Sequence, residues 1–364
     1  MKIGILTYHR AHNYGAMLQA YALRTFLQKQ GHWVEFIDYW PDCHRKQYTL
    51  IKPIRGNSIT NKFINIISDS LTLIRRYKRI KQFENFRNKY LDITEHIRYT
   101  SNTNPILERY DCVIVGSDQV WRTQEYEGKY IGFDAAYFCQ NILYKTRCIS
   151  YAASMGIISL TPEDKKQLQQ YLNKFNSILV REDSLKQLIN SILLPAHVVL
   201  DPTLLLSHKE WNALLPKTRY YNKSYILYYE LIQSKEALIY AKKRARAMNC
   251  ELLIMESIIH TLPRKHHISN ASPIDFMHAI RDAEYVIATS FHGTAFSIIF
   301  EKQFVTIGLK KNADRVITLL KQLHISEHYQ DIPADIPNID YDATNNILND
   351  LRQQSRYLLL NSLQ

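Results

Sequence analysis

The fold of this chain is decided by the stretch Glu284–Phe300, whose sequence is EYVIATSFHGTAFSIIF. Its first part, Tyr285–Ala288, is typical of a short buried strand, and the apolar residues after Gly293 predict a helix. The polar break between them contains Ser290 and His292. N–H groups at a helix start are free to face an anion, and α/β proteins place their chemistry at the carboxyl ends of strands. The break is therefore predicted to be a functional site, although a simple helix cap at Ser290 would leave the same pattern.

Length and charge limit the class of protein. The 364 residues exceed the usual size of one hydrophobic core, and 46% are hydrophobic, so two domains are expected. The formal charge of +12 indicates an anionic partner: nucleic acid, an anionic membrane surface or a phosphorylated small molecule. Nucleic acid is the least favoured, because the basic residues are dispersed and do not alternate with aromatics along one surface.

Cysteine usage and the N-terminus bear on location. The five cysteines are odd in number, widely spaced and without a C-x-x-C pair, so neither a zinc site nor a disulfide framework is expected. The apolar start Lys2–Leu6 is interrupted by polar Tyr8–Arg10, so no signal peptide is predicted. No apolar run reaches the length of a membrane span. We expect a cytoplasmic protein, with any membrane contact peripheral and at the inner face.

Strand and helix patterns alternate along the chain. An apolar strand at 3–7, a helix from Tyr14 and a strand at 34–39 predict the β-α-β opening of a parallel sheet. The alternation continues to residue 206 and restarts at Tyr225, after a stretch that resembles a linker. The predicted fold class is α/β, with two Rossmann-like doubly wound domains, 1–206 and 207–340, facing a cleft. A last helix within 341–364 is expected to pack back on the first domain.

Two further polar clusters follow predicted strands. After the strand at 111–115, Asp118 fits a helix N-cap or a ligand contact, while Gln119 and Trp121 offer an amide and a flat face that suit a sugar. Arg181 follows the strand at 177–180, where its guanidinium is well placed to fork onto a carboxylate or phosphate. Pairing with the neighbouring Glu182 or Asp183 is the alternative for this arginine.

Two basic segments suggest contacts with anions. The helical pattern at 59–91 carries basic residues beside its apolar positions, so it could rest on anionic lipid, although a solvated face on a packed helix is the preferred interpretation. A basic loop contains Arg264, which is predicted to touch an anion. The adjacent His266 and His267 lack a third ligand at metal-binding spacing, so no metal site is expected.

An ordered set of short motifs covers nearly the whole chain. These are Asn13-Tyr14-Gly15-Ala16, Gly116–Trp121, Ser150–Ser154, Arg181–Asp183, Asp201–Thr203 and Ser290–Thr294. In this order they resemble the polysaccharide pyruvyl transferase family. The resemblance implies a two-domain fold similar to GT-B glycosyltransferases, with the first domain on the acceptor side and the second on the donor side. It also implies phosphoenolpyruvate as donor and a pair of sugar hydroxyls as acceptor. The product would be a pyruvate ketal on a repeat unit of a capsular or other exopolysaccharide, built on a lipid carrier.

The resemblance assigns roles to some residues. It links Arg181 to the donor, and it aligns Ser290-Phe291-His292 with an Arg-Leu-His run of the family. The histidine matches, but a serine stands where the family has arginine. Either the donor phosphate needs another cation, for which Arg315, Lys310, Lys311 and Arg264 are the candidates, or the donor differs.

Ketal formation requires an acid, a base and positive charge. His292 is predicted to be the general acid, Arg181 to hold the donor and Asp118 to accept a proton or position the sugar. The remaining predicted substrate contacts are Ser290, Phe291, Gly293, Thr294, Arg315, Lys310, Arg264, Asn13, Tyr14, Gly15, Gln119 and Trp121. The N–H groups of Gly293 and Thr294 are expected to stabilise charge. No cofactor and no metal is predicted, only phosphoenolpyruvate as co-substrate.

Two rival functions stay open from the sequence. One is a GT-B glycosyltransferase that uses a nucleotide sugar. The other is a non-catalytic glycan- or anion-binding relative, an alternative that rests on the serine at position 290 where the family has arginine.

Overall fold

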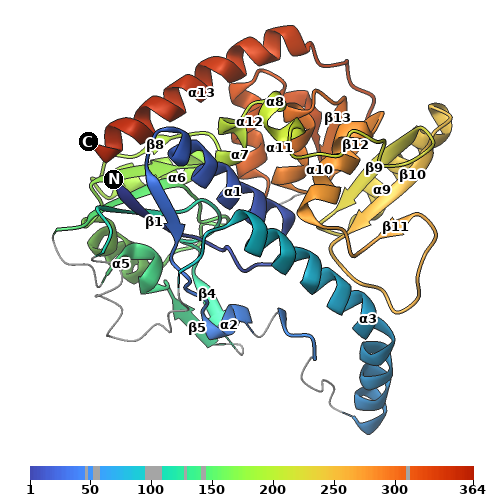
Figure 1. The fold of residues 1–364 in the computed structure, drawn as a ribbon, viewed down its shortest axis with the longest axis horizontal. Helices are drawn as coiled ribbons and strands as arrows, with labels where there is room; N and C mark the ends of the chain where they lie inside the picture. Colours follow the sequence, from blue (N-terminus) through green and yellow to red (C-terminus); the bar gives the residue numbers. More distant parts are fainter. Residues whose placement is uncertain (46–47, 52–57, 95–108, 127–128, 141–144, 309–311) are drawn as a thin grey trace.

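The computed structural model describes residues 1–45, 48–51, 58–94, 109–126, 129–140, 145–308 and 312–364, and it contains two parallel six-stranded sheets with helices packed around them (Figure 1). The first sheet has the order β2-β1-β3-β6-β7-β8. Its strands are β1 (Lys2–Leu6), β2 (Trp33–Phe36), β3 (Cys112–Val115), β6 (Arg147–Ala153), β7 (Ser177–Val180) and β8 (His197–Val198). The predicted opening β-α-β unit is confirmed by the parallel pairing of β1 with β2.

The second sheet repeats this architecture with the order β11-β10-β9-β12-β13-β14. Its strands are β9 (Tyr225–Glu230), β10 (Glu251–Glu256), β11 (His267–Ile268), β12 (Tyr285–Ala288), β13 (Phe304–Ile307) and β14 (Tyr329–Gln330). The predicted α/β class with two doubly wound sheets is confirmed. In such sheets the strand order reverses at one point, between β1 and β3 in the first sheet and between β9 and β12 in the second. Ligands bind beyond the carboxyl ends of the strands at these points.

Helices connect and cover the strands. They are α1 (Tyr14–Lys29), α2 (Asp42–Arg45), α3 (Ile59–Tyr90), α5 (Pro162–Leu172), α6 (Asp183–Ser191), α7 (Pro202–Leu205), α8 (His208–Asn212), α9 (Lys235–Ala247), α10 (Pro273–Asp282), α11 (Phe291–Ile299), α12 (Asp314–Gln322) and α13 (Tyr341–Leu363). An antiparallel hairpin, β4 (Gln124–Tyr126) and β5 (Lys129–Gly132), extends from the first sheet's loops. None of the helices in the described ranges is long and apolar enough to cross a membrane.

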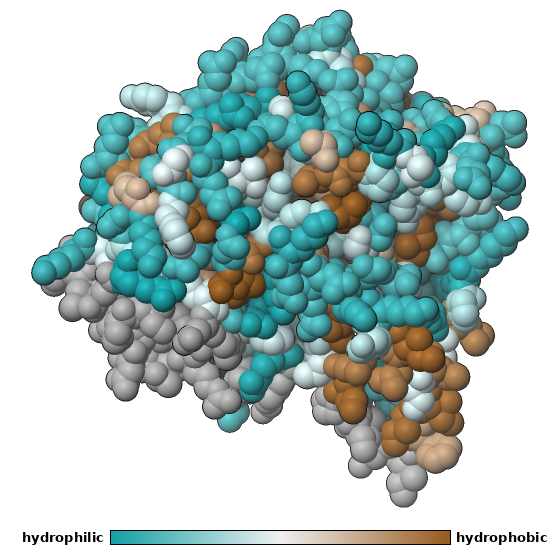
Figure 2. All heavy atoms as spheres, viewed as in Figure 1, coloured by the Kyte–Doolittle hydropathy of each residue, from teal (hydrophilic) through white to brown (hydrophobic). Residues whose placement is uncertain are grey.

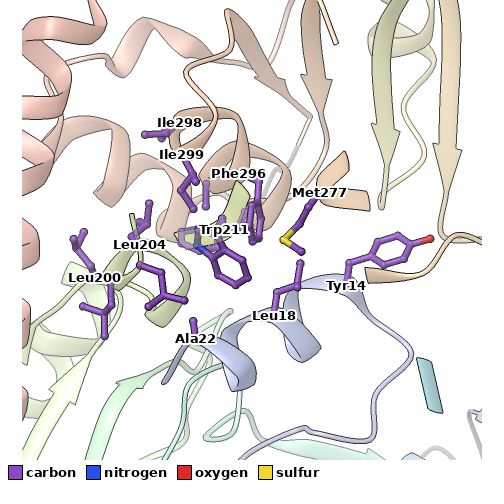
Figure 3. Close-up of a cluster of buried hydrophobic side chains, with 14 of the residues drawn as sticks. Tyr14, Leu18, Ala22, Leu200, Leu204, Trp211, Met277, Phe296, Ile298 and Ile299 are labelled. Carbon is purple, nitrogen blue, oxygen red and sulfur yellow. The ribbon is translucent and has the colours of Figure 1, made fainter. Parts of the chain in front are cut away.

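The largest hydrophobic cluster joins the two sheets. It brings α1 and α7 of the first half together with α10 and α11 of the second, as Figure 3 shows for Leu18, Leu204, Met277 and Phe296. The stretch predicted as a hinge and linker contributes Trp211, which is fully buried and donates a 2.9 Å hydrogen bond to the carbonyl of Thr203. The segment that connects the two halves is therefore itself packed into the shared core at Trp211.

The C-terminal helix returns to the first half of the chain. Helix α13 packs on α7, β6 and β7 (Figure 1). The Ser355 hydroxyl accepts a hydrogen bond of 3.0 Å from the Leu200 N–H, and Arg352 donates one of 2.7 Å to the Leu204 carbonyl. The return of α13 adds a second connection between the two halves.

Candidate active site

The loops that follow β1, β3, β9 and β12 meet at the reversal points of the two sheets. His292 lies here, in the first turn of α11. Ser290 is the N-cap of that helix, and its hydroxyl accepts a 2.9 Å hydrogen bond from the Gly293 N–H. The cap and the histidine thus occur together, so the two interpretations of this stretch are not exclusive.

The imidazole of His292 is held between the two halves of the molecule. Its Nε2 lies 3.7 Å from an oxygen of Asp201 and has no hydrogen bond within the part of the chain that the structure describes. The ring packs against Gly15 at the start of α1, where a Cβ atom would lie 1.9 Å from Nδ1. Because any side chain at position 15 would overlap the ring, the glycine makes the room that the histidine occupies.

Asp201 connects His292 to Arg181. The Arg181 Nη1 lies 3.2 Å from Asp201 Oδ2, and Nη2 donates a 2.8 Å hydrogen bond to the Ser117 hydroxyl. Burial alone raises the pKa of Asp201, but the positive charge of Arg181, followed by that of His292, holds it well below its usual range. The side chain of Arg181 is only 1% exposed, so this arginine serves as the counter-charge of a buried carboxylate.

Among the described residues, Arg181 forms no ion pair with Glu182 or Asp183, its neighbours in the sequence. Glu182 is fully buried and accepts hydrogen bonds from the Ser154 hydroxyl (2.8 Å) and the Met155 N–H (2.9 Å), and burial raises its pKa. The Asp183 N–H donates to the Thr318 hydroxyl at 3.4 Å. The predicted pairing with adjacent acids is therefore wrong, because the strand end turns Arg181 toward Asp201.

A second guanidinium, that of Arg315, faces the same place. The guanidinium carbons of Arg181 and Arg315 lie 5.1 and 5.8 Å from the ring centre of Phe291, within the range of cation–π contacts. Arg315 has one acidic neighbour within 4.0 Å among the described residues, Asp118, and donates no hydrogen bond to any of them. Burial, followed by the charge of Arg181, lowers its pKa. Of the two guanidiniums beside Phe291, Arg315 is thus the one with fewer described partners.

Asp118 is positioned by an unusual backbone conformation. Its φ angle is 83°, in the left-handed region that costs a non-glycine residue roughly 1–3 kcal/mol. Its carbonyl accepts hydrogen bonds from Val120 (2.8 Å) and Ser154 (3.0 Å), which hold this conformation. No helix begins here, so the N-cap interpretation of Asp118 is wrong. Its carboxylate lies between the two guanidiniums, 3.9 Å from Arg181 and 4.0 Å from Arg315.

These side chains border a small cavity of about 190 Å³, called the central pocket below. It is lined by Tyr8, Ala11, Asn13, Tyr48, Asp118, Gln119, Tyr229, Leu231, Ser290, Phe291, His292 and Arg315. Its lining therefore includes seven of the predicted site residues, drawn from both halves of the chain.

Two larger cavities adjoin the central pocket. One, the helix-side cavity, measures about 440 Å³, lies between α3 and the loops of the second sheet, and shares Asn13 and Tyr229 with the central pocket. The other, the aromatic cavity, measures about 770 Å³ and shares Tyr8 and Gln119 with it. Because they share walls with the central pocket on different sides, the three cavities form one cleft.

The helix-side cavity contains a cation without an acidic partner among the described residues. Arg79 donates hydrogen bonds to carbonyls, including that of Ser257 at 2.6 Å. Burial, followed by the charge of Arg79, lowers the pKa of the neighbouring His12 to about 4. His12 is therefore uncharged at neutral pH, and Arg79 supplies positive charge to this cavity.

Several predicted contacts lie away from the central pocket. Trp121 is fully buried, donates a 2.9 Å hydrogen bond to the Tyr137 carbonyl and stacks on Phe138, so it is a core residue. Arg264 is exposed on the loop after β10 and lines none of the three cavities. Tyr14 is almost fully buried and borders the helix-side cavity. Lys310, like Lys311, lies outside the described residues.

The N–H groups predicted to bind an anion are already bonded. That of Gly293 donates to the Ser290 hydroxyl, and that of Thr294 donates to the Ser290 carbonyl at 3.2 Å. The N–H groups of Phe291 and His292 precede them and donate to no other described residue. The N–H groups without a described acceptor therefore lie two residues earlier than expected, at Phe291 and His292. The reason is that the Ser290 cap accepts the N–H of Gly293, the third residue of the helix.

Sequence reasoning assigned no role to Asp201 or to Tyr48 and Tyr229. Asp201 directly follows an apolar stretch and precedes a proline, which is the signal of an acid at the carboxyl end of a strand. Tyr229 is near the end of β9, beside the reversal point of the second sheet. No comparable signal marks Tyr48.

One family model matches most of the chain. A family model described as "Polysaccharide pyruvyl transferase" matches residues 13–311. No curated protein matches the chain.

Solved structures of similar architecture show low sequence identity. The UDP-GlcNAc 2-epimerase from Neisseria meningitidis is 11% identical, with 98% of this chain and 92% of that chain covered and a TM-score of 0.44. The epimerase from Methanocaldococcus jannaschii is 12% identical, with coverage of 96% and 92% and a TM-score of 0.43. An α-glucosyltransferase in complex with UDP and DNA is 9% identical, with coverage of 100% and 95% and a TM-score of 0.48.

Proposed function

The chain belongs to the polysaccharide pyruvyl transferase family, and from that membership we propose that it transfers a pyruvyl group from phosphoenolpyruvate to two hydroxyls of a sugar in a surface polysaccharide. Phosphate is released, and a cyclic ketal is formed. The observation that carries the proposal is that His292, with Asp201 3.7 Å behind it, and Arg315 line the same small pocket.

The central pocket suits a small anionic donor. Its volume of about 190 Å³ is below the roughly 300–1,000 Å³ of pockets for drug-sized ligands. Arg315 presents its guanidinium there without a hydrogen-bond partner among the described residues. A planar guanidinium binds carboxylate or phosphate through two parallel hydrogen bonds. Arg315 is therefore proposed to bind the donor, in place of the arginine that the family has at position 290.

His292 is proposed to deliver the proton that starts the reaction. His292 lines the central pocket, so its imidazole is placed to exchange a proton with a ligand there. Asp201, 3.7 Å from Nε2, orients the ring. The proton goes from the imidazole to the methylene carbon of the donor, which becomes a methyl group, and positive charge develops on the neighbouring carbon.

The acceptor then completes the ketal. One sugar hydroxyl adds to the electron-poor carbon and gives its proton to Asp118 or back to His292, and the bond to the phosphate oxygen breaks. The second hydroxyl closes the ring, and its proton leaves with the phosphate. Asp118 lines the central pocket, so its carboxylate is placed to take this proton or to position the sugar.

The aromatic cavity is the proposed acceptor site. Its lining combines flat aromatic faces with hydrogen-bonding side chains, and its 770 Å³ leaves room for more than one sugar ring. These residues include Tyr8, Tyr39, Trp40, Tyr130, Tyr137, Gln119, Gln124 and Glu125. Because Gln119 borders both cavities, a sugar bound here would lie next to the donor.

The direct test measures phosphate released from phosphoenolpyruvate in the presence of a panel of lipid-linked glycans. Release should require an acceptor, and His292→Ala should abolish it while far-UV circular dichroism and urea unfolding stay close to wild type. An active His292→Ala variant would exclude the histidine from the mechanism. Protection by phosphoenolpyruvate without release on any acceptor would instead favour a non-catalytic glycan-binding relative.

A nucleotide-sugar transferase is the second candidate. The helix-side cavity, at 440 Å³, has the size of a nucleotide site and is lined by Tyr14, Tyr48, Tyr229 and the unneutralised Arg79. Thermal unfolding distinguishes the two functions, because a ligand at about 100 times its Kd stabilises the folded state by about 2.7 kcal/mol. Phosphoenolpyruvate should raise the unfolding temperature, and UDP-sugars should not. The opposite result would support the glycosyltransferase.

A further inference from the structure

The first half of α3 exposes apolar side chains on its outer face. Residues three and four positions apart share one side of a helix. Six of the exposed large residues between positions 63 and 77 are Phe63, Ile66, Ile67, Leu71, Ile74 and Tyr77, and their exposed fractions range from 45% for Ile66 to 70% for Ile74. These six residues are called the α3 apolar face. In Figure 1 this half of α3 extends away from both sheets, and Figure 2 shows a hydrophobic patch at the same place.

The inner side of the same helix is polar and already has partners. Thr72 is 3% exposed, Arg75 donates a 2.6 Å hydrogen bond to the Thr261 carbonyl, and Arg79 donates one of the same length to the Ser257 carbonyl. The sequence-based interpretation of these arginines as a solvated outer face is therefore wrong. The helix turns its polar side toward the protein and its apolar side outward, which is the reverse of a normal surface helix.

Cations lie at one end of the α3 apolar face. Lys78 and Lys81 are exposed and continue the outer side of the helix directly after Tyr77. Beyond them the outer side becomes polar, with Glu84 and Asn85. An apolar tip bordered by lysines is complementary to a bilayer with anionic head groups. The net charge of +12 favours the same surface.

We propose that the α3 apolar face docks on an anionic lipid bilayer. The apolar side chains enter the boundary between head groups and acyl chains, while Lys78 and Lys81 contact the head groups. The inner side of the same helix, through Ser68, Thr72 and Arg79, lines the helix-side cavity. Docking therefore brings the cleft to the membrane surface, where lipid-anchored molecules are found.

Co-sedimentation with vesicles tests this inference and needs no turnover, so its outcome is independent of the proposed transfer reaction. The full chain is mixed with vesicles of equal parts phosphatidylglycerol and phosphatidylcholine, or of phosphatidylcholine alone. We expect binding to the anionic vesicles that weakens at high salt. The variant Phe63→Ser/Ile67→Ser/Ile74→Ser should bind at least tenfold more weakly, as should Lys78→Glu/Lys81→Glu.

A matched control replaces apolar residues that are equally exposed elsewhere. Ile239 and Ile332 are 68% and 84% exposed, so Ile239→Ser/Ile332→Ser should bind vesicles like wild type. Light scattering after size exclusion, without lipid, adds a second measurement. A wild-type dimer that the triple serine variant converts to monomer would assign the face to a second copy of the chain and overturn the proposal. Absence of wild-type binding, or equal loss in the control, would also overturn it.

Discussion

Replacing Gly15 with alanine should test whether α1 sets the position of the His292 ring. A Cβ atom at position 15 would lie 1.9 Å from Nδ1, 2.2 Å from Cγ and 2.4 Å from Cε1 of the imidazole. Favourable contacts between such atoms need about 3.5–4.0 Å, so the ring has to move by more than about 1 Å. That movement changes the 3.7 Å separation between Nε2 and Asp201.

The expected effects are large in both rate and stability. A misplacement of about 1 Å in a catalytic group costs roughly 100-fold in rate. Overpacking of a tight site costs about 1–3 kcal/mol in the free energy of unfolding. In a helix without this contact, Gly→Ala would instead stabilise by about 0.5–1 kcal/mol. Position 15 is the second residue of α1, so the sign of the effect depends on the imidazole.

A double-mutant cycle isolates that dependence. Urea unfolding is measured for wild type, Gly15→Ala, His292→Ala and the double variant, together with phosphate release. Gly15→Ala should destabilise the wild type and stabilise the His292→Ala protein, because removing the ring makes room for the methyl group. Activity should be reduced in Gly15→Ala and absent in both variants that lack the histidine.

The cycle also shows what would refute the reasoning. If Gly15→Ala changed the free energy of unfolding equally in both backgrounds, the ring would not lie against Gly15. If the single variant kept wild-type phosphate release, α1 would not determine the position of the acid.

Three further predictions concern the charges around the pocket. Asp201→Asn leaves Arg181 buried without its counter-charge and should lower the free energy of unfolding by about 3–5 kcal/mol in urea; an unchanged value would contradict the ion pair. Because the folded-state pKa of Asp201 is depressed, its contribution is present above about pH 4, the usual carboxyl pKa, and is lost as pH falls toward the folded value. The unfolding curves of wild type and Asp201→Asn should therefore converge in acid, and parallel curves would assign the acid sensitivity to other groups. Arg315→Gln should raise at least tenfold the phosphoenolpyruvate concentration that gives a set increase in unfolding temperature, whereas Arg264→Gln should leave this concentration unchanged. Equal effects of the two substitutions would show that the donor does not bind in the central pocket.

Short-range patterns predicted the secondary structure well. The expected strand at 285–288 is β12, and the helix after the polar break is α11. These elements are set by local apolar runs and by a cap, both of which are visible in the sequence. The segment around Trp211 was assigned to a linker because it lies between the two alternating series of strands and helices. Its burial depends on partners such as Phe296, far away in the chain, which no local pattern reveals.

Pairings between distant residues account for the errors in the site. Arg181 was placed on the donor because it follows a strand, but its guanidinium is enclosed by Ser117 and Asp201. Arg315 was one of four candidate cations; the structure separates it from Arg264 because Arg315 lines the central pocket with Phe291 and His292 and Arg264 does not. Trp121 was chosen for its flat face, yet a tryptophan after a strand fills a core as readily as it binds a sugar.

The guanidiniums of Arg181 and Arg315, both beside Phe291, have different roles in a site where serine replaces the family's arginine at position 290. Arg181 is occupied by Asp201, which in turn orients His292, so its effect on the reaction is indirect. Arg315 has only Asp118 within 4.0 Å among the described residues, and an incoming anion would complete its coordination. A serine at position 290 therefore does not by itself remove the positive charge that the proposed donor needs. Asp201 neutralises the buried Arg181 whether or not the site turns over, so the phosphate-release assay, and not this ion pair, separates a transferase from a relative that has lost turnover.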